Sequence, residues 1–143
     1  MFGFIKKILG TKQDRDLKQY LAFVAEINHH YEQYQSLSND DLRAKTLDFR
    51  TRIKEYLSDI DTEIASINQQ AREAEDFNDK ESLFKEVDEL RKTRDKSLED
   101  ILLSILPEGF AVVKETSRRF TQNETLVVTA TDHDRSLAAK NGK

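Results

Sequence analysis

Apolar residues recur along most of this chain at spacings of three and four, the period of one face of an α-helix. The first such stretch is short, from Phe2 to Leu9, and Lys6 and Lys7 lie toward its other side. A longer stretch covers 14–34, and Asp14 is placed to favour the positive start of a helix. Its apolar positions are Leu17, Tyr20, Leu21, Val24, Ile27, Tyr31 and Tyr34. The pattern therefore predicts a short amphipathic helix followed by a longer helix.

Two further apolar stripes predict an antiparallel hairpin of long helices with coiled-coil spacing. Ser38 followed by Asp41 resembles a capping box, so the first arm is expected from there to about Glu75. Asn78 with Glu81 gives a second capping signal for the return arm. The residues expected to pack the hairpin are Ile53, Leu57, Ile60, Ile64, Ile67, Leu83, Val87, Leu90, Leu98 and Ile101.

The last third of the chain predicts one further helix and little regular structure after it. Pro107 is expected to end the return arm, because it lacks an N–H donor, and to begin a helix that runs to Arg119. The packing face of that helix is expected to comprise Phe110, Val113 and Phe120. Residues 125–130 form the only strand-like run, and 132–143 is expected to be a polar tail. The predicted fold is all-α, with a short strand-like segment near the end.

Composition and charge exclude several classes of function. The chain has 27 acidic and 23 basic residues, and a net charge of −4 argues against a nucleic-acid binder. Because it has no Cys, it has no disulfide, thiolate metal site or cysteine nucleophile, and a reducing, cytoplasmic setting is expected. Its 4 Gly stand far apart, so no phosphate-binding loop is expected in these residues. No apolar run is long enough for a membrane-spanning helix.

The residues that could support catalysis or metal binding do not form a site in the sequence. His29 and His30 point to different sides of a helix, and neither has a second ligand one turn away. Asp132, His133 and Asp134 could offer oxygen and nitrogen ligands to a metal, but the side chains of adjacent residues point in different directions. A turn is therefore the expected structure here. Most other acids lie among Lys and Arg at helical spacing and form a solvated face. No catalytic residue, cofactor site or metal site is therefore expected here.

Two segments are better suited to binding partners. The first helix is too short to be stable alone, and its apolar face with nearby Lys suits either a protein groove or an anionic bilayer. Its expected docking residues are Phe2, Phe4, Ile5, Lys6, Lys7, Ile8, Leu9 and Lys12. The hairpin is acidic, because residues 58–100 contain seven basic residues and about twice as many acidic ones. The hairpin is either a coiled-coil spacer or a partner-binding arm, and the sequence leaves both open.

Two motifs resemble the SecA family, the motor of bacterial protein export. Leu37 to Ile53 reads LSNDDLRAKTLDFRTRI and is similar to the L-S-x-[DE]-[DE]-L-x-x-K-T-x-x-F-R-x-R-[LI] pattern near the start of the family. Leu106 to Glu115 reads LPEGFAVVKE and resembles L-P-E-A-F-A-V-V-R-E, with departures at Gly109 and Lys114. With matches in the opening residues, the resemblance covers a little over half of the chain.

The resemblance implies an ATPase on the cytoplasmic face of the plasma membrane that binds the SecYEG channel and anionic phospholipids and drives preproteins across. ATP and magnesium would belong to the full-length protein, because the family's G-E-G-K-T loop does not occur before Lys143. The resemblance also implies that 1–12 docks on lipid and channel, while 13–57 and 103–120 brace the first nucleotide-binding domain. In the family pattern a short link joins the two motifs, so the hairpin 58–102 is an insertion and the resemblance implies no role for it. Residues 121–143 are expected to be a strand-like segment and a flexible tail.

Two other classes of protein remain as alternatives. One is a free-standing coiled-coil adaptor that forms a homodimer through the hairpin stripe, which sedimentation at several concentrations would reveal. The other is a small enzyme, which the lack of a nucleophile, metal or phosphate constellation disfavours. The leading hypothesis is the amino-terminal segment of a SecA motor, which supplies docking and scaffolding while other domains handle the preprotein.

Overall fold

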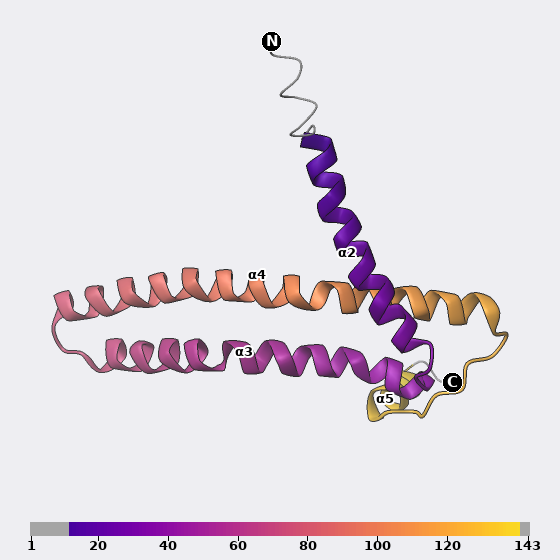
Figure 1. Cartoon of the computed structure of the whole chain (residues 1–143). Helices are drawn as coiled ribbons and strands as arrows, with labels where there is room; N and C mark the ends of the chain where they lie inside the picture. The colour runs from indigo at the N-terminus through magenta and orange to yellow at the C-terminus, as the bar shows by residue number, and fades with distance from the viewer. Residues whose placement is uncertain (1–11, 141–143) are drawn as a thin grey trace, which may run out of the picture. The chain divides into compact units, whose positions relative to one another are not determined.

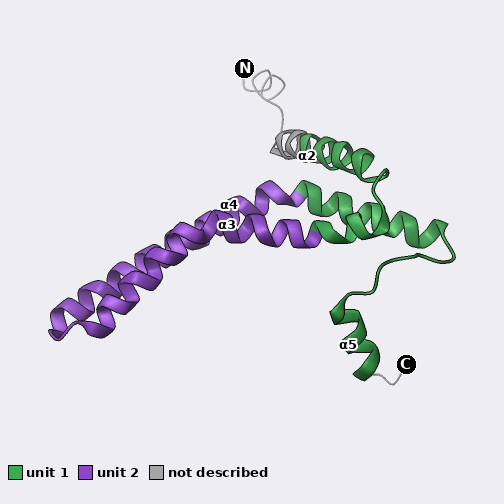
Figure 2. Cartoon of the chain, turned by 90° about the horizontal axis from the view of Figure 1, so that it is seen from below, with its two compact units in different colours: residues 1–45, 107–143 green, residues 46–106 purple. Residues whose placement is uncertain are grey.

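The computed structural model describes residues 12–140, which form four α-helices and no strand. The helices are α2 (Lys12–Tyr34), α3 (Asn39–Glu73), α4 (Phe77–Gln122) and α5 (Asp132–Lys140) (Figure 1). The predicted all-α fold is confirmed for this range. The chain divides into two compact units, coloured separately in Figure 2. Unit 2 spans Thr46–Leu106, and unit 1 contains the residues before and after it.

Unit 2 is a helical hairpin in which α3 and α4 run antiparallel and side by side (Figures 1 and 2). Its turn is closed by Asp76, whose Oδ1 accepts the N–H groups of Asn78 and Asp79 at 2.7 and 3.2 Å. An aspartate that accepts such bonds satisfies donors that the first turn of a helix leaves free. Asp76 therefore caps α4, and the expected cap at Asn78 is wrong by two positions.

The centre of the hairpin is apolar, and Arg94 and Asp61 form an ion pair across its arms. Leu57, Ile67, Ala71, Val87 and Ile105 are buried. All ten residues expected to pack the hairpin are buried or half-buried. Arg94 donates to both carboxylate oxygens of Asp61 across the hairpin, which lowers the pKa of Asp61. This contact places Asp61 of α3 opposite Arg94 of α4.

Pro107 lies inside α4 and does not end it, contrary to expectation. An interior proline leaves the carbonyl of Leu103 without its helical donor, and it costs about 3 kcal/mol relative to Ala. The following turns place Ala111 and Glu115 in fully buried positions, and Pro107 itself is buried. Tertiary packing on the C-terminal side thus holds the helix together through a residue that would otherwise break it.

The core of unit 1 forms where three helices meet. Tyr34 from α2, Leu42 from α3 and Ala111 from α4 are buried together, and Ile27, Tyr31, Leu37 and Val112 pack against them. Phe23 meets Phe110 edge-on, with ring centroids 6.3 Å apart. Because Ala111 has only a methyl side chain, the helices can approach closely at this point.

The expected packing face of the last part of α4 is wrong at Val113 and Phe120, whereas Phe110 contacts Phe23 with about half of its surface still exposed. Phe110, Val113 and Phe120 are 51%, 63% and 68% exposed. The buried positions of this segment are Ala111, Glu115 and Arg119. Two charged residues thus face inward where apolar residues were expected, because hydrogen bonds to neighbouring groups compensate for their removal from water.

The strand-like run 125–130 is not a strand, and the expected polar tail contains α5. An isolated strand has no backbone partners here, and helix α5 begins instead at a capping box. The Thr131 N–H donates to Asp134 Oδ2 at 2.8 Å, and the Asp134 N–H donates to Thr131 Oγ1 at 3.3 Å. These two bonds satisfy donors at the start of α5 reciprocally.

Candidate functional site

The two sequence motifs meet in the core of unit 1, where Leu42 of the first and Ala111 of the second are buried together, although residues 54–105 separate the motifs in the chain. The hydroxyl of Tyr34 donates to Glu108 Oε2 at 3.1 Å, which joins the end of α2 to α4. Lys45 Nζ lies 5.1 Å from the centre of the Tyr34 ring. Lys114 Nζ donates to Asn28 Oδ1 at 2.7 Å and lies over the Tyr31 ring. The first motif and the second therefore form one braced junction.

Arg119 is at the centre of this junction. It is 7% exposed, and its Nε donates to Oε1 of the fully buried Glu115 at 2.7 Å. Its Nη2 donates to the carbonyls of Leu37 at 2.7 Å and Tyr34 at 3.2 Å, and its Nη1 to Asn39 Oδ1 at 2.6 Å. The Tyr34 carbonyl is at the end of α2, where the helix carries partial negative charge, and the Leu37 carbonyl lies in the turn just after it, so a guanidinium suits this position. We call Arg119 and its four partners the Arg119 brace.

Glu115 remains ionised in this setting. Arg118 donates to it through Nε at 2.8 Å and through Nη2 at 2.6 Å. These bonds from Arg118, together with the bond from Arg119, hold the pKa of Glu115 below its usual range despite burial. A carboxylate held in this way is a structural anion rather than a group that exchanges protons near neutral pH.

Residues 127–134 are fastened to the first turn and a half of α3, and we call this segment the strap. Asp40 accepts the N–H of Thr129 at 2.8 Å and its hydroxyl at 2.7 Å. Arg43 donates to both carboxylate oxygens of Asp134 at 2.7 Å. The Thr129 hydroxyl lowers the pKa of Asp40, and Arg43 holds the pKa of Asp134 far below its usual range. The strap is thus held by charge-assisted bonds and not by a β-ladder.

The residues expected to dock on lipid or channel fall largely outside the described range. Phe2, Phe4, Ile5, Lys6, Lys7, Ile8 and Leu9 precede it, and Lys12 is the first residue of α2. Among residues 12–140, no group of three or more His, Cys, Asp or Glu is arranged to hold a metal ion. The His29 ring contacts Gln33, and the carboxylate of Asp134 belongs to the strap.

Neither the Arg119 brace nor the strap is predicted from the sequence. The only local signal for the brace is the spacing of Glu115 with Arg118 and Arg119, which also occurs on many solvated helices. For the strap, Thr131 and Asp134 have the spacing of a capping box, but nothing in the sequence connects them to Arg43. Both depend on contacts between residues more than 80 positions apart.

The same junction lies within the part of the chain that is shared with known proteins. The family described as the SecA DEAD-like domain matches residues 5–129. This chain belongs to the SecA family. The match includes both motifs, the Arg119 brace and the whole of the hairpin, so the SecA resemblance found in the two motifs is confirmed over most of the chain.

Several SecA proteins are similar over nearly the full chain. Protein translocase subunit SecA of Porphyromonas gingivalis is 42% identical over 135 residues, which cover 94% of this chain and 12% of that protein. The subunit from Amoebophilus asiaticus is 40% identical over 140 residues, 96% of this chain and 12% of that protein. The Chloroherpeton thalassium subunit is 40% identical over 133 residues. No solved structure matches the chain.

The chain therefore spans about an eighth of the length of these SecA relatives. Among residues 12–140, none of the helices combines the length and the apolar character needed to cross a bilayer. The hairpin is present in the relatives that align over more than nine-tenths of this chain, so it is a shared feature of that group and not particular to one sequence.

Proposed function

We propose that this chain serves as a docking and bracing segment of a preprotein translocation motor. The amino-terminal residues dock on an anionic membrane surface and on the SecYEG channel. Unit 1 braces the first nucleotide-binding domain, and ATP with magnesium binds in other parts of the full-length protein. The observation that carries this proposal is 42% identity over 135 residues to a protein translocase subunit.

The geometry of unit 1 supports the bracing role. The Arg119 brace joins α4 to α2 through the Tyr34 carbonyl and to α3 through Asn39, by buried and part-buried bonds, and the strap adds contacts to the start of α3. Phe110, Val113 and Phe120 leave an apolar surface on the outer face of α4. A rigid scaffold with an open apolar face is suited to supporting a neighbouring domain.

The docking role can be tested by co-sedimentation of the chain with vesicles. Vesicles of phosphatidylglycerol and phosphatidylcholine should bind the wild-type chain, and binding should weaken as salt rises. Lys6→Glu with Lys7→Glu should weaken binding roughly 30-fold or more, since each basic residue near an anionic surface contributes about 1 kcal/mol. Vesicles of phosphatidylcholine alone should bind neither form.

The matched control is Lys54→Glu with Lys96→Glu, which makes the same change of net charge on exposed positions of the hairpin. This control should bind vesicles nearly as well as the wild type. Equal losses in the two double variants would show that only net charge matters and would refute a specific docking segment.

A further inference from the structure

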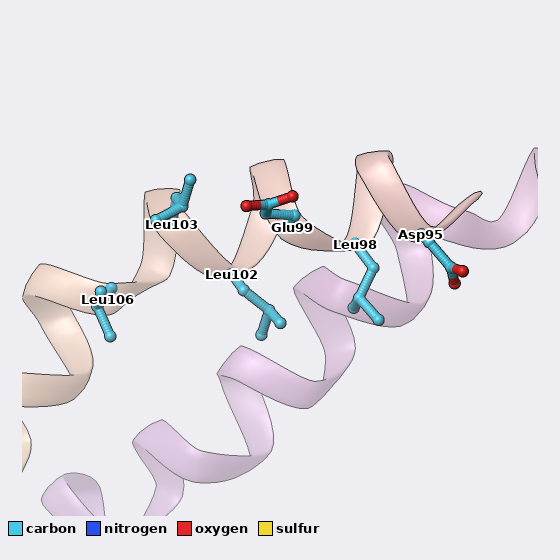
Figure 3. A pocket seen from close by; sticks show the side chains of 6 residues that line it. All are labelled: Asp95, Leu98, Glu99, Leu102, Leu103 and Leu106. Atoms are coloured by element: carbon cyan, nitrogen blue, oxygen red, sulfur yellow. The ribbon is translucent and has the colours of Figure 1, made fainter. Parts of the chain in front are cut away.

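A solvent-open apolar hollow lies on α4 within unit 2 (Figure 3). Its volume is about 280 Å³. Leu102, Leu103 and Leu106 are 46%, 55% and 40% exposed there. We call this surface the leucine groove, and its lining residues are Asp95, Leu98, Glu99, Leu102, Leu103 and Leu106.

The leucine groove suits the side chains of a polypeptide better than a small molecule. Small-molecule pockets usually enclose about 300–1,000 Å³ and converge several polar groups on the ligand. The leucine groove is smaller and open, and its only charged or polar side chains are those of Asp95 and Glu99. Leucines arranged along one helix at spacings of three and four are the surface into which an amphipathic helix packs.

The charge around the groove selects the kind of partner. Asp95 and Glu99 are four residues apart on successive turns of α4, with Asp95 at one end of the groove and Glu99 partway along it (Figure 3). Neither forms an ion pair with a Lys or Arg of residues 12–140 that would neutralise it. Unit 2 as a whole has 16 acidic and 10 basic residues. An anionic bilayer would be repelled, and a second copy would bring like charges together.

We propose that the leucine groove binds an amphipathic helix of a partner protein that has leucine-like residues on one face and Lys or Arg at its flanks. The apolar face inserts between Leu98, Leu102 and Leu106, while basic side chains meet Asp95 and Glu99. This site is separate from the lipid-docking and bracing roles, because it uses neither the amino-terminal segment nor unit 1.

A designed peptide can serve as the probe. We would use an 18-residue helix of Leu and Lys with one apolar face and a fluorescein label, and measure anisotropy as the full chain is added. One comparison peptide carries Glu in place of Lys, and another carries Ser in place of Leu. Only the Leu and Lys peptide should bind, because the interaction requires both the apolar face and the positive flanks.

Two variants locate the binding to the groove. Leu102→Ser should weaken peptide binding about tenfold, because serine cannot replace the apolar contact that the leucine side chain makes with the apolar face of the peptide. Its control is Leu47→Ser, at an exposed leucine of α3 outside the groove.

Asp95→Asn with Glu99→Gln should weaken binding at low salt. Its control is Asp59→Asn with Glu63→Gln, which has the same spacing and the same charge change.

Circular dichroism first confirms that each variant is folded, and Leu103→Ser replaces Leu102→Ser if the latter unfolds. Equal losses in each variant and its control would overturn the proposal, because they would indicate non-specific attraction. Self-association that Leu102→Ser abolishes would identify a second copy as the occupant and would also overturn it. So would binding to anionic vesicles that depends on Leu102.

Discussion

A single buried arginine links three segments of unit 1. The guanidinium of Arg119 neutralises Glu115 and also donates to two backbone carbonyls, that of Tyr34 at the end of α2 and that of Leu37 in the turn that follows. A lysine could not do this, because its ammonium is a compact charge without the planar fork of donors. The brace therefore depends on the shape of the side chain as well as on its charge.

Arg119→Met is expected to lower the free energy of unfolding by about 2–4 kcal/mol, because it leaves a buried carboxylate and two carbonyls short of donors. Arg119→Lys should restore part of that loss. Urea denaturation followed by circular dichroism measures both. Phe120→Ala, at the exposed neighbouring position, is the control and should change stability by less than about 0.5 kcal/mol. An Arg119→Met variant as stable as the wild type would disprove the brace.

The stability of unit 1 should also depend on pH through Glu115. Bonds from Arg118 lower the folded-state pKa of Glu115 below its ordinary value of 4.5. The stabilisation is therefore fully present above pH 4.5 and is lost as the pH falls through the folded-state pKa. Glu115→Gln should be less stable than the wild type at pH 7, and the difference should shrink toward pH 3. A constant difference across that range would contradict this assignment.

At the scale of elements, apolar periodicity predicts the helices well and says less about their ends. The stripes locate α2, α3 and the hairpin arms, because long helices with one apolar face carry a repeated signal. The strap could not be predicted, because β-branched residues at 127–129 favour a strand only where a partner strand exists. The proline at 107 suggested a helix end that does not occur, because the packing of Ala111 and the hydrogen bonds that Arg118 and Arg119 donate to Glu115 hold the following turns in place.

Gly109 lies inside α4, where glycine has a lower helix propensity than alanine. A Cβ built at this position meets no atom within 4 Å, so a methyl group fits without strain. Gly109→Ala should raise the free energy of unfolding by about 0.5–1 kcal/mol, because glycine loses more backbone entropy in a helix. Thermal and urea unfolding measure the gain. A loss of stability would indicate that Gly109 is needed for the path of α4 next to Pro107.

At the scale of the molecule, the two units have separate cores and separate polar contacts. Unit 1 is held by Tyr34, Leu42 and Ala111 with the Arg119 brace, while unit 2 relies on its own apolar stripe and the Asp61 to Arg94 ion pair. Units of this kind can open independently in hydrogen exchange. The outer hairpin should therefore be removable without unfolding unit 1.

Replacing residues 62–93 by a four-residue Gly and Ser linker tests this independence. Asp61 and Arg94 form an ion pair, so the two cut ends lie opposite each other on neighbouring helices. The axes of packed helices are about 8–10 Å apart, and four extended residues can span that distance. Amide exchange at Leu42 and Ala111 should remain slow in the shortened chain. Fast exchange at both positions would show that unit 1 needs the hairpin.

The same variant separates docking from the hairpin. The replacement removes nine acidic and five basic residues, so the net charge rises from −4 to zero while Lys6 and Lys7 remain. Binding to anionic vesicles should then be as strong as in the wild type or stronger, since repulsion from the bilayer decreases. The leucine groove, at 95–106, also remains, and peptide binding should persist. Weaker vesicle binding would instead place part of the membrane contact on the hairpin, where an acidic surface gives no physical reason for it.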